Sequence, residues 1–282
     1  MTATYSARLP QSEAEAISAA LDAPLEAIGV THSLFENDGS WEVTVYVEPM
    51  TDTRVQETLA TVVPDRTFER TELPDDDWVT RSLSALAPVR AGRFIVHGSH
   101  DCKAPHAGET AIRIDAARAF GTGHHGTTAG CLVAIDDYLK RRPVHRAIDV
   151  GTGSGVLAIA LAKRSRRRIV ATDIDPVATG IARENARING VGPLVRTVTA
   201  AGLDHAGIAT RAPFDLIVAN ILAGPLRAMA PSLARHRSSG GTVILSGLLE
   251  RQRASVVSAY RAQGLRLRRT ILREGWATLI LD

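Results

Sequence analysis

From residue 89 onward, short apolar runs alternate with longer segments in which apolar positions recur at helical spacing. The apolar runs are RAIDV, RIVATD, DLIVAN and GTVILS, and the helical segments are 154–165, 176–189, 224–236 and 249–263. Strands that alternate with helices in this way predict βαβ units and a doubly wound, mostly parallel α/β sheet. The segment LRLRRTILREGWATLILD holds two strand candidates around the turn signal REG, so we also expect a C-terminal antiparallel hairpin.

The first 72 residues follow a different pattern. Four strand-like segments (TYSARL, THSLFE, WEVTVYVEP and RTFERTEL) and two helical segments (11–22 and 52–61) occur in the order strand-helix-strand-strand-helix-strand. This order fits a small ferredoxin-like α+β domain. LPDDDWVTRSLSAL then predicts a helix with aspartates at its N-terminus, where the helix dipole favours them. We therefore expect an α+β domain (1–72), a linker helix (73–88) and the α/β domain (89–282).

Composition narrows the class of protein. The 282 residues are 45% hydrophobic and 22% charged, which is ordinary globular usage. A net charge of +3 is small for a dedicated nucleic-acid-binding protein. Two isolated cysteines, Cys102 and Cys131, provide neither a disulfide framework nor a zinc site. Because the N-terminus lacks a secretory pattern and no apolar run approaches the ~18 residues that span a membrane, we expect a cytoplasmic monomer without membrane contact.

The sharpest local feature is IDVGTGSGVLAIALA, in which a predicted strand ends at Asp149 and a helix begins near Ser154. Gly151, Gly153 and Gly155 allow a tight turn that brings bare backbone against a ligand. The loop also directs a helix N-terminus at that ligand, which favours a carboxylate or phosphate. The spacing is G-x-G-x-G and not the G-x-G-x-x-G of dinucleotide enzymes. It resembles the S-adenosylmethionine loop of class I methyltransferases.

Asp173 ends the next predicted strand, 22 residues after Gly151. An acid at about this distance can accept hydrogen bonds from both hydroxyls of a ribose. Alternatively, Asp173 or Asp175 only caps the helix that opens at Pro176, because Asp followed by Pro at the first helical position suits a cap. We assign the ribose to Asp173, and the cap or a place beside the adenosine to Asp175.

A second glycine cluster, AFGTGHHGTT, precedes the first strand of the sheet. Backbone N–H groups around Thr122 and Gly123 and the hydroxyls at 127–128 could hold the carboxylate of the cofactor or cover it. The adjacent His124 and His125 cannot easily share one ion, and no His or Cys lies at ligand spacing, so we expect no metal. His125 is either a general base near neutral pH or a residue that only holds the loop closed.

DLIVAN ends at Asn220, and the ligands of doubly wound sheets bind beyond the carboxyl ends of the strands. The side-chain amide is therefore expected to face the same crevice as Gly151 and Asp173. There it could accept a hydrogen bond from an attacking amine and donate another elsewhere. The alternative is that Asn220 only caps the turn before Gly224 and Pro225.

Several segments occur together in the order, and nearly the spacing, of the PrmA family of bacterial ribosomal protein methyltransferases, which the chain resembles. These segments are GRFIVHGSHD, IDAARAFGTGHHGTTAGCL, IDVGTGSGVLAIA, ATDIDPVA, ENARINGV, DLIVANILAGPL and GGTVILSGLLERQ. The resemblance is strong over 75–282 and weak over the first seventy residues. The combination of FGTG-H-TT with ANILAGPL is its most specific part.

The resemblance implies a small N-terminal domain that grips a large-subunit ribosomal protein, free or ribosome-bound, a linker helix and a class I methyltransferase domain. It implies methyl transfer from S-adenosylmethionine to lysine side chains and the N-terminal α-amine of that substrate. The cofactor contacts implied by the family motifs fall on Thr122, Gly151, Gly153, Asp173 and Asn220.

In this interpretation Asn220 orients the amine and His125 is a candidate helper. The family loop most often reads FGTG-T-H-P-TT, whereas this chain has His124 in place of Thr and Gly126 in place of Pro. The change loosens the loop and weakens the assignment of His125. A strong base is not required, because an apolar pocket beside a sulfonium helps to supply a neutral lysine amine.

Three alternatives stand beside this interpretation. A related lysine methyltransferase could act on a different protein, which the N-terminal domain would decide. A nicotinamide-dependent oxidoreductase would need the third-glycine spacing and a redox set of side chains, and the chain has neither. A non-catalytic ribosome-associated module would not need intact Gly151, Gly153, Asp173 and Asn220.

Two basic segments, KRRPVHR and KRSRRR, precede the first strand of the sheet and follow the helix after it. They could make a weak contact with ribosomal RNA. Because Lys103, Lys140 and Lys163 are the only lysines, the arginine excess also fits genome composition. An ordinary solvated surface is therefore the alternative.

Overall fold

The computed structural model describes residues 3–37, 40–47, 50–72, 88–99, 105–114, 125–203 and 205–282. The chain divides into two compact units, Met1–Leu83 and Ser84–Asp282. Residues 73–87 of the expected linker helix lie outside the described residues. Within the described ranges, no helix is both long enough and apolar enough to cross a membrane.

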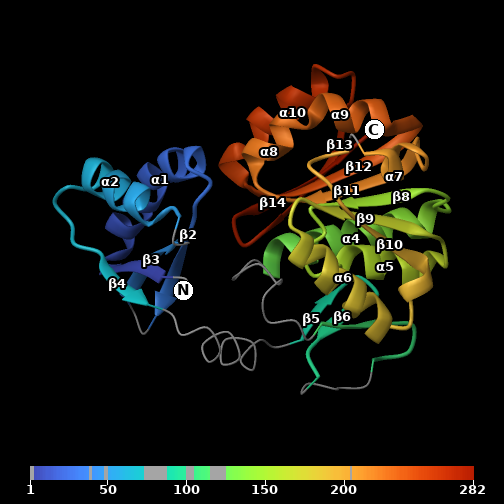
Figure 1. Ribbon diagram of the computed structural model, residues 1–282, viewed down its shortest axis with the longest axis horizontal. Helices are drawn as coiled ribbons and strands as arrows, with labels where there is room; N and C mark the ends of the chain where they lie inside the picture. The colour runs from blue at the N-terminus through green and yellow to red at the C-terminus, as the bar shows by residue number, and fades with distance from the viewer. Residues whose placement is uncertain are drawn as a thin grey trace. The chain divides into compact units, whose positions relative to one another are not determined.

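The first unit, blue in Figure 1, is a ferredoxin-like α+β sandwich. Its elements are β1 (Ala3–Leu9), α1 (Gln11–Ala27), β2 (Thr31–Asn37), β3 (Ser40–Val47), α2 (Asp52–Val62) and β4 (Glu69–Glu72). The sheet is antiparallel in the order β2-β3-β1-β4. Because successive side chains of a strand point to opposite faces, Val43, Val45 and Val47 all enter the core that contains Leu21 and Leu25 of α1. The element order predicted from the sequence is confirmed.

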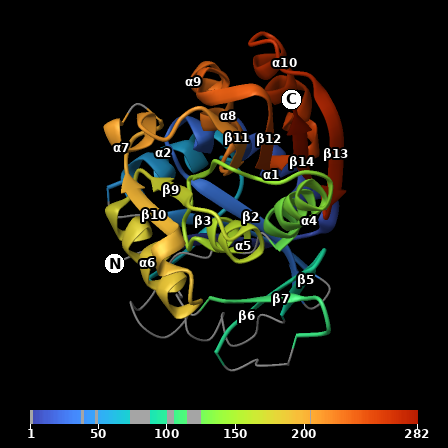
Figure 2. The ribbon, with the colours of Figure 1, turned by 90° about the vertical axis from the view of Figure 1, so that its right-hand side faces the viewer.

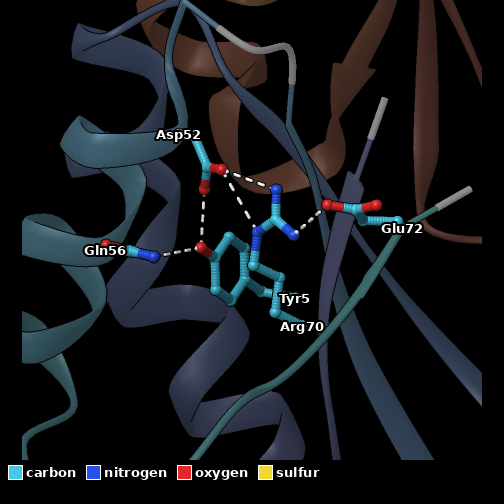
Figure 3. A network of polar contacts seen from close by, with 5 residues as sticks. All are labelled: Tyr5, Asp52, Gln56, Arg70 and Glu72. Carbon is cyan, nitrogen blue, oxygen red and sulfur yellow. Dashed lines mark hydrogen bonds and ion pairs between the residues drawn. The ribbon is translucent and has the colours of Figure 1, made fainter. Parts of the chain in front are cut away.

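A polar network joins the start of α2 to two strands (Figure 3). The hydroxyl of Tyr5 on β1 donates to Asp52 at 2.6 Å, and Gln56 donates to the Tyr5 oxygen at 2.6 Å. Arg70 on β4 donates to the second oxygen of Asp52 at 2.8 and 3.2 Å and to Glu72 at 3.0 Å. The hydrogen bonds from Tyr5, and then those from Arg70, lower the pKa of Asp52 because they favour its charged form.

The second unit is a doubly wound α/β domain with a seven-stranded sheet in the order β10-β9-β8-β11-β12-β14-β13. Its strands are β8 (Ala147–Val150), β9 (Ile169–Asp173), β10 (Val195–Thr199), β11 (Phe214–Asn220), β12 (Arg237–Leu249), β13 (Leu267–Arg273) and β14 (Trp276–Leu281). The strands from β10 to β12 in that order pair in parallel, and β14 pairs antiparallel with β12 and β13. The mostly parallel sheet and its C-terminal hairpin are therefore confirmed.

Helices cover both faces of this sheet (Figures 1 and 2). They are α4 (His125–Arg141), α5 (Val156–Ser165), α6 (Pro176–Ile188), α7 (Ala206–Ala209), α8 (Ala223–Ala228), α9 (Ala230–His236) and α10 (Arg253–Arg261), with 3-10 turns at Gly192–Leu194 and Glu250–Gln252. Helices α4, α5 and α6 pack on one face, and α8, α9 and α10 on the other. Leu216 and Val218 of β11 enter the first core, and Ile217 and Ala219 enter the second. Burial on both faces explains why β11 reads as a continuous apolar run.

Three of the differences between the structure and the sequence prediction concern how the second unit is built. The helix expected at 224–236 is two helices, α8 and α9, because Pro231 fits only the first turn of a new helix. Strand β10 at the sheet edge was not predicted. Neither was a three-stranded sheet of β5 (Val89–Ala91), β6 (Phe94–His97) and β7 (Thr110–Arg113), whose β5 and β7 contact α4 and α5. Arg93 ties this sheet to α4 through a 2.6 Å ion pair with the buried Asp136.

Candidate active site

Three polar side chains lie where adjacent parallel strands end. Asp149 is the penultimate residue of β8, just before the glycine loop, Asp173 is the last residue of β9, and Asn220 is the last residue of β11. Because β9, β8 and β11 are neighbours and run parallel, all three lie at the carboxyl edge of the sheet. This is the edge at which doubly wound sheets bind their ligands, as the sequence predicts.

The glycine loop between β8 and α5 has a backbone that other residues rarely adopt. Gly151, Gly153 and Gly155 have φ angles of 69°, 52° and 83°, which are left-handed. The N–H groups of Gly151 and Thr152 donate to the carbonyl of Thr172 at 2.8 and 2.9 Å, which attaches the loop to β9. A Cβ atom at position 151 would collide with the side chain of Ile221. Glycine at 151 is therefore required by both the φ angle and the space.

Asp149 is buried beneath this loop, with 1% of its surface exposed. Its Oδ2 accepts hydrogen bonds from the Thr152 hydroxyl at 2.7 Å and from the N–H of Ala158 at 3.0 Å. Its Oδ1 has no hydrogen-bond partner among the described residues. Burial raises the pKa of Asp149 to about 6, although the two hydrogen bonds act in the opposite direction. The carboxyl group thus keeps one acceptor for a ligand and changes charge near neutral pH.

The carboxylate of Asp173 is held by the backbone around it. Its Oδ2 accepts from the N–H of Gly153 at 2.9 Å, and its Oδ1 accepts from the N–H of Asp175 at 3.1 Å. Asp175 is the N-cap of α6, because its side chain accepts from the N–H of Val177 at 2.8 Å and Pro176 follows it. The cap predicted for Asp175 is confirmed. Each oxygen of Asp173 retains a lone pair, as a ribose contact requires.

Asn220 projects towards helix α4 and not into a cap. Its Nδ2 donates to the hydroxyl of Thr128 at 3.4 Å, a long hydrogen bond, and Thr128 is only 8% exposed. The N-cap of α8 is Leu222, so the alternative in which Asn220 caps that helix is wrong. Since the amide nitrogen faces Thr128, the amide oxygen is left as a hydrogen-bond acceptor.

The sequence prediction offered the hydroxyl at position 128 to the carboxylate of the cofactor and missed its contact with Asn220. The available signal was the spacing of Gly126 and Gly130, which share one face of the helix. A Cβ at position 130 would overlap the side chain of Thr278 on β14, so α4 packs very close to the sheet. This close approach brings Thr128 to the end of β11.

The other predicted contacts cannot be placed in the same way. Thr122, Gly123 and His124 lie outside the described residues, and His125 is the first residue of α4. Their assignments to the cofactor and to catalysis stay predictions.

The described residues fit an adenosyl group with a charged amino-acid tail. Gly151 and Gly153 present backbone without side chains, and Asp173 presents acceptors for hydroxyl groups. Ile174, directly after it, is 73% exposed and offers an apolar surface to a flat base. The unpartnered oxygen of Asp149 provides a further acceptor beneath the glycine loop. The arrangement therefore suits S-adenosylmethionine.

Comparison with known proteins agrees with this geometry. Residues 5–282 match the profile of the family described as "Ribosomal protein L11 methyltransferase (PrmA)". The "Ribosomal protein L11 methyltransferase" of Mesorhizobium japonicum is 52% identical over 275 residues, which is 95% of this chain and 95% of that protein. The protein of the same name from Brucella suis is 48% identical over 274 residues, 96% of each chain.

A solved structure is also similar. The crystal structure of the ribosomal protein L11 methylase from Lactobacillus delbrueckii subsp. bulgaricus is 29% identical, with a TM-score of 0.63 over 70% of this chain and 98% of that chain. The family profile and the relatives span both units of the chain. The chain therefore belongs to the ribosomal protein L11 methyltransferase (PrmA) family and is an S-adenosylmethionine-dependent methyltransferase.

Proposed function

We propose that this enzyme acts in the cytoplasm and methylates lysine side chains and the N-terminal α-amine of the large-subunit ribosomal protein L11. The observation that supports the proposal is the length of the chain that aligns with relatives named for this substrate. Relatives named for this substrate align with 95% of the chain, so they share the small first unit as well as the catalytic one. A methyltransferase with another substrate would be expected to share the catalytic unit and to differ in the first unit.

At the carboxyl edge, the chain's own residues have distinct tasks. The loop from Gly151 to Gly155 brings bare backbone and the start of α5 to the cofactor, and Asp173 accepts hydrogen bonds from its ribose. When bound, S-adenosylmethionine supplies a methyl group on a sulfonium that is already reactive towards a neutral amine. The oxygen of Asn220 accepts a hydrogen bond from an N–H of the substrate amine. This bond orients the lone pair of the amine nitrogen towards the methyl group that is transferred.

The amine must lose its proton before it can react. A lysine with its ordinary pKa of ~10.4 is neutralised at pH 7 at a cost of about 4.6 kcal/mol, from 1.36 kcal/mol per unit. Leu222, two residues after Asn220, is 41% exposed and offers an apolar wall for the lysine stem. Desolvation against such a wall and the nearby positive sulfur lower the pKa of the amine. A dedicated base is not needed, and His125 has at most the part of a helper.

The first unit is the candidate for substrate recognition. It has its own core and sheet, so it can present a surface without disturbing the catalytic fold. We further propose that the enzyme works as a monomer on free or ribosome-bound substrate, with a weak contact to ribosomal RNA.

Mass spectrometry of purified ribosomal proteins incubated with enzyme and isotope-labelled S-adenosylmethionine tests the proposal. The label is expected on lysines and the N-terminal amine of L11 alone. The Asn220→Ala variant serves as the control, because it removes the acceptor for the amine but none of the described loop contacts to Asp173. Label on a different protein would contradict the substrate assignment and support a related lysine methyltransferase.

A further inference from the structure

A pocket of about 510 Å³ lies at the amino edge of the catalytic sheet. Its floor includes Ile169 and Phe214, which begin β9 and β11 and are buried. Arginines 146, 168, 196 and 211 line it. The proposed cofactor site, with Asp173 and Asn220, lies at the opposite ends of the same strands. A four-residue strand such as β8 separates the two edges by roughly 13 Å at 3.3 Å per residue.

Folding gathers these arginines from four separate segments. Arg146 ends KRRPVHR and Arg168 ends KRSRRR, the two basic segments of the sequence, whereas Arg196 lies on β10 and Arg211 lies just before β11. Most arginines of the two basic segments do not line the pocket. The sequence runs alone therefore did not reveal this site.

The four arginines of the pocket have no carboxylate partner among the described residues. The described lining residues include no Asp or Glu, and no carboxylate of the described residues forms an ion pair with any of the four arginines. Asp215 is outside the lining and offsets part of this charge without an ion pair, because its two oxygens accept the backbone N–H groups of His145 at 2.7 Å and Arg146 at 3.0 Å. Elsewhere in this unit, arginines such as Arg93 and Arg268 are paired with acids.

Helix dipoles do not account for the arrangement. Cations near a helix C-terminus are stabilised by its carbonyl groups, and Lys163 and Arg164 occupy the last turn of α5. These two side chains bond to residues of β7, at Ala111 and Thr110, and do not line the pocket. Arg168 lies beyond the end of α5, directly before β9, so the dipole of α5 does not explain its position.

We propose that this pocket binds phosphate groups of an RNA backbone. This inference rests on the proposed function, because an enzyme that acts on a ribosomal protein meets ribosomal RNA. Guanidinium groups match phosphate oxygens in pairs and stay charged at all working pH values. The ring of Phe214 in the lining is 1% exposed and offers no surface for base stacking, which leaves the exposed imidazole of His145 as the aromatic group that a base could reach. The four guanidinium groups contact phosphates, which carry no sequence information directly. Bound RNA leaves the cofactor crevice open.

Fluorescence anisotropy with a labelled single-stranded RNA of mixed sequence, measured with the full chain at several salt concentrations, tests the proposal. The test variant carries Arg146→Gln, Arg168→Gln, Arg196→Gln and Arg211→Gln. Four lost phosphate contacts are expected to reduce the dependence of log affinity on log salt by up to about 3, at ~0.7 per contact. Affinity near 0.1 M salt should fall at least about tenfold.

A matched control removes the same charge from exposed arginines outside the pocket, with Arg235→Gln, Arg253→Gln, Arg261→Gln and Arg266→Gln. This control is expected to bind RNA nearly as the parent does, and equal losses in both variants would overturn the proposal. A variant with lysine at the four pocket positions should keep most of the salt dependence, which separates charge from folding defects. Inorganic phosphate that binds the parent but not the pocket variant, together with equal RNA affinity in the two proteins, would show a site for small anions only and would also overturn the proposal.

Methylation of free ribosomal protein separates this proposal from the proposed function. The pocket variant is expected to methylate the free protein at the parent rate, because none of its four positions contacts the cofactor crevice. Loss of RNA binding with unchanged methylation supports the pocket. Intact RNA binding by the pocket variant refutes the pocket and leaves the methyltransferase assignment untouched.

Discussion

The backbone N–H of Gly153 donates a hydrogen bond to Oδ2 of Asp173 at 2.9 Å. This bond joins the glycine loop after β8 to the end of β9, so the loop and the acid form one unit. The second oxygen of Asp173 is fixed by the N–H of Asp175. A carboxylate held at both oxygens is already oriented before a ribose arrives, which reduces the entropy lost on binding.

Replacement of Asp173 by Ala is therefore expected to weaken S-adenosylmethionine binding by about 1–3 kcal/mol, the usual effect of losing buried hydrogen bonds to a charged group. Isothermal titration calorimetry measures the change. Asp175→Ala is the matched control, because it removes a helix cap worth about 1 kcal/mol of stability and no proposed ribose contact. An affinity unchanged by Asp173→Ala would remove the ribose role.

The contact between Thr128 and Asn220 predicts a positioning effect. Thr128→Val keeps the shape of the side chain but removes the hydroxyl that accepts from Asn220. The amide should then lose its fixed orientation, and kcat/KM for the protein substrate should fall about tenfold, or ~1.4 kcal/mol. Thr128→Ser restores the hydroxyl and should recover most of the rate. A Val variant with the parent's kcat/KM would mean that the hydrogen bond does not position the amide, and a Ser variant as slow as Val would mean that the methyl group of Thr128 is also needed.

Asp149 predicts a pH dependence of stability in the cofactor-free protein. Its pKa is about 6 when folded, against 3.8 when unfolded, so the folded state binds the proton more tightly. The contribution of this group is therefore fully present below pH 3.8 and is lost as the pH rises through 6, by about 3 kcal/mol at 1.36 per unit.

The Asp149→Asn variant keeps an oxygen that can accept from Thr152 and Ala158 but carries no charge. Urea unfolding from pH 4.5 to 7.5 should show the variant gaining stability relative to the parent as the pH rises. Ordinary carboxylates, whose pKa falls on folding, make both proteins more stable as the pH rises. Subtracting the unfolding free energy of one protein from that of the other cancels this shared contribution. A difference that does not change with pH would contradict the raised pKa.

The strand ends could be predicted from the sequence because parallel topology alone places them. Apolar runs marked β8, β9 and β11, and the residues at their carboxyl ends then had to share one edge. Asp175 followed by Pro176 also contained its own local signal for a cap. These features depend on periodicity and on residues a few positions apart.

Features that depend on distant packing could not be read in this way. Thr128 reaches Asn220 only because α4 lies against the sheet at Gly130, and this is a contact across 92 positions of sequence. Four arginines of the amino-edge pocket likewise come together only through strand order. Strand β10 was missed because VRTVT is short and carries Arg196 within it, so neither length nor continuous apolarity marked it.

The network in the first unit predicts a local effect on stability. Tyr5→Phe removes the hydroxyl that donates to Asp52 and accepts from Gln56. We expect the opening free energy of α2, measured by hydrogen exchange in the full chain, to fall by about 1 kcal/mol. The pKa of Asp52 should rise, so the stability that its charge contributes should be lost at a higher pH on acidification. Exchange in α5 of the other unit should not change.

Deletion of residues 1–72 tests the division of labour between the two units. The catalytic unit keeps both of its buried cores without the first unit, because none of the residues in those cores comes from before residue 89. S-adenosylmethionine should therefore bind the truncated chain with an affinity within about twofold of the parent, and thermal unfolding should show one cooperative transition. Methylation of the ribosomal protein should be lost, since the truncated chain lacks the proposed recognition surface. Addition of the separate first unit in trans should not restore it unless the two units bind each other. Retained methylation at the parent rate would place substrate recognition in the catalytic unit. Loss of cofactor binding by a truncated chain that still unfolds in one normal transition would show that the first unit contributes to the cofactor site.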